Sequence, residues 1–238
     1  MGDFAEFLKT NLVHVAPILI AGAFAVAIIV ERTKALYQDF PIRNSEEFFH
    51  RLSDLIMGGK TGDALALCDR YPGKPAARVA KQALLRAHQP ETLIQHGLEL
   101  AVGEATQSIQ KRTGFLAMVA NVATLLGLLG TIAGLIHSFE AVGHADAQQK
   151  SALLAAGIST AMNATMLGLG VAIPCMIAFS LLMNRSNRLI AEVEHSAIRS
   201  LDLLKQRYFS VETAALSAEL SSEVVSSKSG TQSIGGAA

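Results

Sequence analysis

The sequence predicts an all-α integral membrane protein with three transmembrane helices and a helical insertion between the first and the second. Residues 114–139 and 151–183 contain no Asp, Glu, Lys or Arg. Each run exceeds the roughly 20 residues with which a helix crosses about 30 Å of hydrocarbon. Residues 12–30 form a third apolar run, in which His14 is the only strongly polar side chain. The charged residues cluster between and after these runs, as they do in a membrane protein with an aqueous part.

Small residues are frequent in the second and third apolar runs. Glycine weakens a soluble helix, but in lipid it lets two helix backbones approach closely. Gly130 and Gly134 form a GxxxG pair, which predicts that the second span packs closely on another helix. Pro174 interrupts the hydrogen bonding of the third span, because proline cannot donate the i−4 bond, and we expect it to loosen this helix locally.

The composition excludes several classes of protein. The formal net charge is zero, which argues against a generally basic nucleic-acid binder. The two cysteines, Cys68 and Cys175, offer neither a disulfide framework nor zinc-ligand spacing. No nucleophile–base pair or cluster of metal ligands is evident, so an enzyme is the weakest class and no cofactor is expected beyond a transported ion.

The chain begins with a short segment, residues 1–11, ahead of the first span at 12–30. The leading residues MGDFAEF lack the positive charge with which a signal peptide begins, so we expect the span to be retained. Residues 31–113 read as a helical domain in which no run alternates as a strand would. Asn44 is expected to cap a helix, with Glu47 completing a capping box. The last helix, from residue 91, is expected to continue into the second span without a break.

The distribution of Lys and Arg predicts the orientation in the membrane. Residues 31–113 hold twelve of these side chains and residues 184–238 hold six. By the positive-inside rule both segments are cytoplasmic, and the N-terminus and the 140–150 loop face the periplasm. Residues 184–209 keep helical spacing and are expected to extend the third span into the cytoplasm. Residues 210–238 are rich in Ser, Ala and Gly and are predicted to be disordered.

Hydroxyl side chains are the candidates for chemistry at membrane depth. Thr124 and Thr131 lie within about 20° of each other around a helix, whereas Thr160 and Asn163 project away from Thr165. One hydroxyl face can line an ion pathway. The alternative is that each threonine bonds a carbonyl of its own or a neighbouring helix, which is worth about 0.6 kcal/mol. Neither the second nor the third span carries an Asp, Glu, Lys or Arg, so an ion path needs a carboxylate from another polypeptide.

The runs FLAMVANVATLLGLLGTIAGLIHSF and GISTAMNATMLGLGVAIP resemble the MotA/TolQ/ExbB proton channel family, and in particular its three-span ExbB/TolQ branch. The resemblance is strong over residues 114–185. It implies a homopentamer whose second and third helices enclose a pore. The pore would hold a single-span partner like ExbD, TolR or MotB, whose Asp carries H⁺ or Na⁺. In the family a Thr of GLLGT and a Thr of AT-x-x-GL face that Asp, and here these are Thr131 and Thr165.

Two departures from the family pattern affect the choice of ion. A Glu of the family's GIAEAL segment is replaced by Thr160, and a Pro of the second span is replaced by Thr124. Thr124 adds a hydroxyl on the face of Thr131, which makes Na⁺ an alternative to H⁺.

The resemblance implies a ring subunit of an inner-membrane motor that uses the ion gradient to do work in the envelope. A MotA-like stator for gliding or flagellar motility and a non-conducting membrane scaffold are the alternatives.

Overall fold

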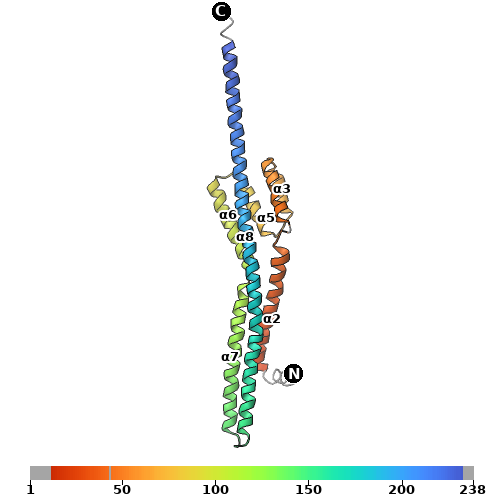
Figure 1. Cartoon of the computed structure of the whole chain (residues 1–238), viewed down its shortest axis with the longest axis vertical. Helices are drawn as coiled ribbons and strands as arrows, with labels where there is room; N and C mark the ends of the chain where they lie inside the picture. The colour runs from red at the N-terminus through yellow and green to blue at the C-terminus, as the bar shows by residue number, and fades with distance from the viewer. Residues whose placement is uncertain (1–11, 43, 233–238) are drawn as a thin grey trace, which may run out of the picture. The chain divides into compact units, whose positions relative to one another are not determined.

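The structure, a computed structural model, describes residues 12–42 and 44–232, so the predicted periplasmic segment 1–11 lies outside the described residues. Within these ranges every regular element is helical, which confirms the all-α fold (Figure 1). The elements are α2 (Leu12–Lys34), the π-helical turn η1 (Ala35–Asp39), α3 (Ser45–Met57), α4 (Thr61–Asp69), α5 (Pro75–Leu85), α6 (Glu91–Gln110), α7 (Gly114–Gly143) and α8 (Lys150–Gln232).

Three helical stretches of the described chain are long and apolar enough to cross a membrane. They are Val15–Asp39, Glu91–Gly143 and Lys150–Ser217. The second and third contain the apolar runs 114–139 and 151–183, and the first overlaps the run 12–30. The prediction of three membrane helices is therefore confirmed by length and composition.

The chain divides into two compact units, each built from two separate parts of the sequence. The membrane unit comprises residues 1–40 and 107–189, and the helical unit comprises residues 41–106 and 190–238. The membrane unit therefore holds the three apolar runs, and the helical unit holds most of the charged insertion.

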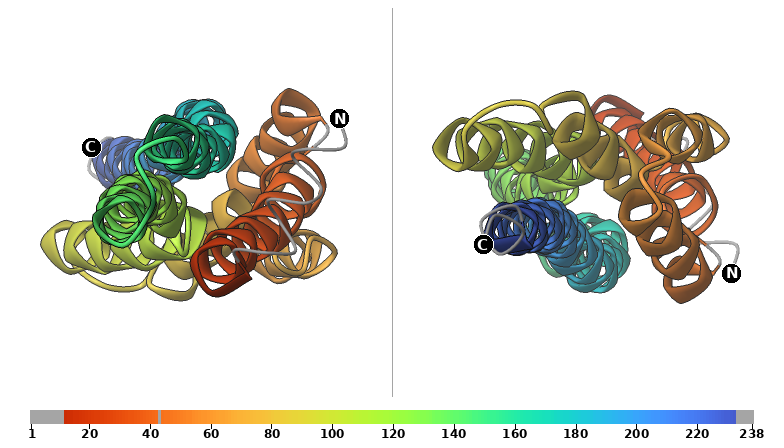
Figure 2. Two further views of the ribbon diagram at one scale, coloured as in Figure 1. Left: turned by 90° about the horizontal axis from the view of Figure 1, so that it is seen from below. Right: turned by 90° about the horizontal axis from the view of Figure 1, so that it is seen from above.

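In the membrane unit, α2 lies beside both α7 and the first half of α8, as the end-on views show (Figure 2). Val15 of α2 packs on Ala164 and Leu167 of α8. Gly22 of α2 lies where a Cβ atom would be 3.4 Å from the Val171 side chain. Contacts at Ala164 and Gly22 thus place the first span against the third.

The second span does not continue α6 without a break, so that expectation was wrong. Residues 111–113 form a turn, in which Arg112 has a φ of 62°, before α7 begins. The break lets the end of α2 bond to both sides of the turn. Glu31 accepts two hydrogen bonds from Arg112, at 2.6 and 2.8 Å. The buried guanidinium of Arg32 donates to the carbonyl oxygen of Ile109, near the end of α6, where helical carbonyls lack partners.

The helical unit has its own apolar core. The ring of Phe48 makes edge-to-face contacts with the rings of Phe49 and Tyr71, with centroids 5.1 and 5.2 Å apart. The hydroxyl of Ser196, on α8, is fully buried and donates to the carbonyl oxygen of Ala76 at 2.9 Å. A buried hydroxyl needs such a partner, because an unpaired one costs about 1–3 kcal/mol. This bond ties the later part of α8 to α5.

The capping box expected at α3 takes a different form. Asn44 makes no side-chain bond to the backbone of the first turn; its Nδ2 donates instead to Glu47 Oε2 at 3.0 Å. Glu47 also accepts a hydrogen bond from Arg51 at 2.5 Å, which draws its carboxylate along the helix surface. The bond from Asn44 and the charge of Arg51 together lower the pKa of Glu47.

The segment predicted to be disordered, residues 210–238, also differs from the expectation. The structure continues α8 as a helix through Gln232, and residues 233–238 lie outside the described part. No Gly or Pro occurs between Pro174 and Gly230, so no helix breaker stops α8 before that point. The serine content that suggested disorder is accommodated locally, for example by the hydroxyl of Ser217 donating to the Ala214 carbonyl at 2.9 Å.

The buried Cys68 of the helical unit gives a testable consequence for pH. Burial raises the pKa of its thiol from 9.0 to about 11. The folded state therefore binds the thiol proton more tightly than the unfolded state, and this contribution to stability is complete below pH 9.0 and is lost as the pH rises towards about 11. In a Cys175→Ser background, we expect iodoacetamide to label Cys68 much more slowly in the folded protein than in urea. Equal labelling rates in mildly alkaline buffer would contradict the burial.

Candidate ion-pathway face

The helices α7 and α8 form an antiparallel pair whose backbones meet at glycine and alanine. A Cβ atom on Gly130 would lie 2.6 Å from the Cβ of Ala164, and one on Gly168 would lie 2.7 Å from the backbone oxygen of Ala123. A Cβ atom on Gly134 would lie 3.2 Å from the Cα and Cβ of Ala161, which is a tight contact. The structure therefore places both members of the predicted GxxxG pair in the helix contact, where a side chain would push the backbones apart.

This register brings Thr131 and Thr165 to the same level. Gly130 and Ala164 are in contact, and the two threonines are the next residues along their helices. Each step along a helix turns by about 100°, and because the helices run in opposite directions, both steps lead to the same side of the pair. Thr124 lies about two turns from Thr131 on that side of α7. We call the side defined by Thr124, Thr131 and Thr165 the threonine face.

The three hydroxyl groups of the threonine face donate to backbone carbonyls. Thr131 Oγ1 donates to the oxygen of Leu128 at 2.6 Å, and Thr124 Oγ1 donates to the oxygen of Ala120 at 3.0 Å. Thr165 Oγ1 donates across the helix pair to the oxygen of Gly127 at 3.5 Å. The bonding expected of a purely structural threonine is thus present. It leaves the lone pairs of each hydroxyl oxygen available, since a hydroxyl has one donor and two acceptor sites.

Exposed apolar side chains surround the threonine face. On α7 the exposed side chains Leu128 and Leu135 lie within about 60° of Thr131, and on α8 Ile158 and Leu169 lie within about 40° of Thr165. The described part of α7 and the membrane part of α8 add no Asp, Glu, Lys or Arg between residues 114 and 139 or between 151 and 183. The face therefore offers hydroxyl oxygens in an apolar setting without a charge of its own.

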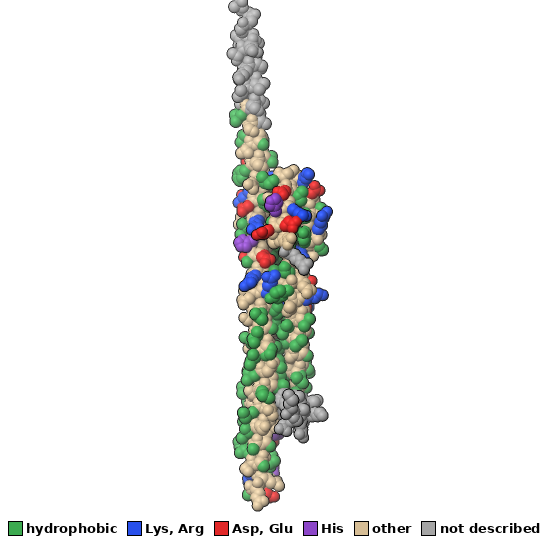
Figure 3. All heavy atoms as spheres, turned by 45° about the vertical axis from the view of Figure 1, so that its right-hand side comes forward, with side chains coloured by type: hydrophobic (Ala, Val, Ile, Leu, Met, Phe, Trp, Pro, Cys, Tyr) green, Lys and Arg blue, Asp and Glu red, His purple; other side chains and the backbone are tan. Residues whose placement is uncertain are grey.

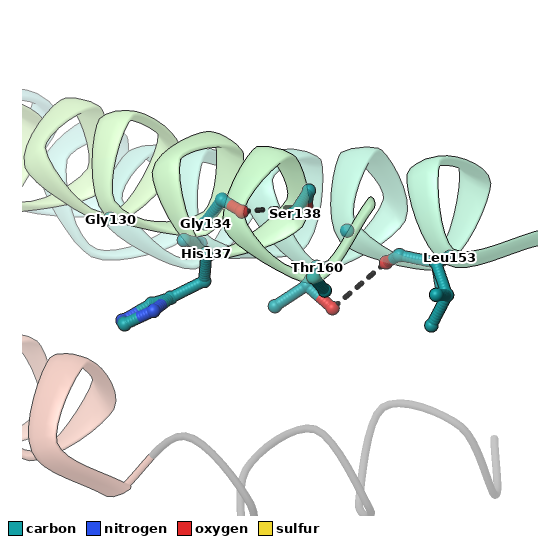
Figure 4. Close-up of a pocket in the computed structure, with 10 residues that line it drawn as sticks. Gly130, Gly134, His137, Ser138, Leu153 and Thr160 are labelled. Atoms are coloured by element: carbon teal, nitrogen blue, oxygen red, sulfur yellow. Dashed lines mark hydrogen bonds between the residues drawn. The ribbon is translucent and has the colours of Figure 1, made fainter. Parts of the chain in front are cut away.

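Thr160 lies on the opposite side of the helix pair. It lines a pocket of about 230 Å³ together with His137, Ser138 and Gly157. Figure 4 shows His137 and Thr160 pointing to the same side, and Thr160 Oγ1 donates to the Ala156 oxygen at 3.0 Å. The sequence separated Thr160 from Thr165 by helical angle, and the structure agrees.

Pro174 lies within α8, which continues through it without interruption. Its effect on the flexibility of the helix remains a prediction.

The sequence reasoning missed the polar contacts at the end of the spans that adjoins η1. Arg112 and Glu31 are 81 residues apart, and Arg32 and Ile109 are 77 apart. No local spacing reveals such pairs. The one available signal was the placement of charged side chains directly after the first apolar run.

Among the described residues, no group of three or more His, Cys, Asp or Glu side chains could hold a metal ion.

Comparison with known proteins shows which class this fold and face define. The chain belongs to the family described as the MotA/TolQ/ExbB proton channel family, which it matches over residues 73–195. It is therefore a membrane protein of a proton channel family, and the resemblance recognised in its second and third spans is confirmed.

Two relatives are similar over about three quarters of the chain. The Tol-Pal system protein TolQ of Haemophilus influenzae is 32% identical over 197 residues, which cover 76% of this chain and 84% of the relative. The biopolymer transport protein exbB1 of Vibrio cholerae is 26% identical over 183 residues, which cover 76% of this chain and 79% of that relative. Among solved structures, a chain of C. jejuni MotAB aligns with 82% of this chain and 81% of its own length, with a TM-score of 0.49 and 16% identity.

The close contact of α7 and α8 can be tested by adding one methyl group. Gly168→Ala places a Cβ 2.7 Å from the Ala123 backbone oxygen, and we expect the strain to destabilise the fold by about 1–3 kcal/mol. Gly170→Ala is the matched control, since a Cβ there has nothing within 4 Å. Thermal unfolding in detergent should show a lower midpoint for Gly168→Ala alone. Equal midpoints for both variants would contradict the close approach.

Proposed function

We propose that this chain is the ring subunit of an ion-driven motor of the bacterial inner membrane, like ExbB with ExbD or TolQ with TolR. The proposal rests on one observation: Thr131 and Thr165 lie at the same level on one uncharged side of the α7–α8 pair. A second copy of the pair beside the first would continue this face. Five copies, as family resemblance suggests, would enclose a pore lined by threonine hydroxyls and apolar side chains.

The titrating group comes from a partner. The described α7 and the membrane part of α8 offer no carboxylate between residues 114 and 139 or 151 and 183, and an ionisable group is what a proton path requires. We infer a single-span subunit that carries an Asp at the level of the two threonines. In an apolar pore an ionised Asp is costly, so the surroundings favour the protonated acid. The hydroxyl oxygens of Thr131 and Thr165, whose hydrogens bond to carbonyls, can accept the hydrogen bond of that acid.

Ion movement would then be coupled to movement of the partner. When the Asp loses its proton it prefers a hydrated or hydrogen-bond-donating environment to the acceptor surface of the threonines. Protonation allows it to pass the next subunit. The result is a rotation or another rearrangement of the partner relative to the ring, powered by the gradient. Oxygen acceptors can also coordinate a partly dehydrated Na⁺, and Thr124 adds one acceptor, so sodium is the alternative ion.

The topology in the membrane follows the positive-inside rule. Twelve Lys and Arg side chains lie in residues 31–113 and six lie in residues 184–238, so we place both segments in the cytoplasm. The N-terminus and the 140–150 loop then face the periplasm. A MotA-like stator for gliding or flagellar motility uses the same ring chemistry, and the partner's periplasmic domain would distinguish the two tasks.

The role of the threonine face can be tested by ion flux. In liposomes containing the chain and its single-span partner, we expect Thr131→Ala and Thr165→Ala each to reduce gradient-driven flux by up to about tenfold, because a hydrogen bond between the neutral acid and a hydroxyl is worth about 0.5–1.5 kcal/mol. Thr131→Ser and Thr165→Ser keep the hydroxyl and should keep most of the flux. Repeating the measurement without sodium identifies the ion.

Thr160→Ala is the matched control, because Thr160 makes the same kind of bond to its own helix but lies on the other side of the pair. It should leave flux close to normal. Normal flux in both Thr131→Ala and Thr165→Ala would remove the assigned role. An intact complex of the unmodified chain and its partner that passes no ions would favour the scaffold instead.

A further inference from the structure

Basic side chains gather at the end of the membrane unit that adjoins η1. They come from the end of α2, the α6–α7 turn and the middle of α8: Arg32, Lys34, Lys111, Arg112, Arg185 and Arg188. Against these six stand two carboxylates, Glu31 and Asp39. On the face drawn in Figure 3, blue side chains lie where the hydrophobic surface ends. The arrangement leaves uncompensated positive charge beside an apolar surface, where phospholipid headgroups would be.

Arg185 is the side chain in this group that is best placed to bind an anion. Its guanidinium carbon lies 5.3 Å from the centre of the Tyr37 ring, so the planar group is stacked and oriented. Its Nε is buried and has no hydrogen-bond partner. No carboxylate within the described ranges forms an ion pair with it. The buried Nε cannot reach a ligand, but the two terminal nitrogens of a stacked guanidinium can donate two parallel hydrogen bonds to the oxygens of a phosphate group.

The buried guanidinium of Arg32 is a second positive charge at this end that lacks a counter-charge. Its side chain is 4% exposed, and its Nε also lacks a hydrogen-bond partner. It donates to the Ile109 oxygen, which is a dipole and not a counter-charge. The neighbouring carboxylate of Glu31 is already hydrogen-bonded twice to Arg112. An anion bound at this end of the membrane unit would therefore lower the electrostatic cost of burying Arg32.

The surface next to Arg185 suits an amphiphile better than a free ion. Leu181 and Ile177 lie one and two turns before Arg185 on the same side of α8, and they are 62% and 57% exposed. Tyr37, on which Arg185 stacks, is 57% exposed. A phosphate at Arg185 thus has an apolar track leading away from it along the helix, in the direction in which the acyl chains of a lipid extend.

We propose that Arg185, stacked on Tyr37, binds the phosphate of an anionic phospholipid whose acyl chains run along Leu181 and Ile177. Arg188, one turn further along α8, adds positive charge to the same site. The site lies away from the threonine face and does not depend on ion conduction. Bound lipid would set the position of the helices relative to the membrane surface. It would also stabilise the contact between α8 and the end of α2.

The test is lipid binding by the full chain in detergent, followed by native mass spectrometry. The probes are dioleoylphosphatidylglycerol, which is anionic, and dioleoylphosphatidylcholine, which is not. We expect the anionic lipid to bind the unmodified chain preferentially. Arg185→Gln should weaken this binding about fivefold, the equivalent of the roughly 1 kcal/mol that one basic side chain contributes near an anionic lipid. Arg70→Gln, which removes an exposed charge from the helical unit, is the matched control and should leave binding unchanged.

Several results would overturn the proposal. Equal binding of the two lipids by the unmodified chain would show that charge does not select the ligand, whatever the variants do. Equal loss in Arg185→Gln and Arg70→Gln would replace the site by a general effect of net charge. Displacement of the lipid by inorganic phosphate alone would show that the site takes a free ion. Thermal unfolding of both variants, with and without lipid, checks that each is folded, and a midpoint raised by the anionic lipid in the unmodified chain supports the site independently.

Discussion

The contact between the backbones of α7 and α8 determines most of what the membrane unit can do. Gly130 against Ala164 and Gly168 against Ala123 leave no room for larger side chains. Because the helices meet this closely, their register is fixed, and Thr131 and Thr165 come to one level. The same contact leaves the larger apolar side chains on the outside, where they face lipid or other subunits.

The end of the spans that adjoins η1 obeys a different constraint. There the apolar spans end, and charged side chains at the end of α2 bond to residues on both sides of the turn between α6 and α7. Arg112, at a φ of 62°, pairs with Glu31, and Arg32 bonds the carbonyl of Ile109. A straight continuation of α6 into α7 would not present these partners. The turn thus exchanges one stretch of helical hydrogen bonds for contacts between distant parts of the sequence.

Features that depend on local pattern could be predicted from the sequence. Charge-free runs revealed the three spans, and helical angle alone grouped Thr124 with Thr131 and separated Thr160 from Thr165. The level of Thr131 relative to Thr165 required the helix register, which no single helix contains. The break at residues 111–113 and the Arg185–Tyr37 stack were out of reach for the same reason. Composition misled at residues 210–232, where the lack of Gly and Pro mattered more than the abundance of Ser.

The direction of the hydroxyl hydrogen bonds on the threonine face affects which ions could pass through a pore lined by it. Thr124, Thr131 and Thr165 all point their hydrogens at carbonyl oxygens and present only the negative ends of their dipoles. Chloride is stabilised by hydrogen-bond donors, and these three side chains offer it none. A pore built from this face would discriminate against anions by polarity alone, without a fixed negative charge that would also trap the cation.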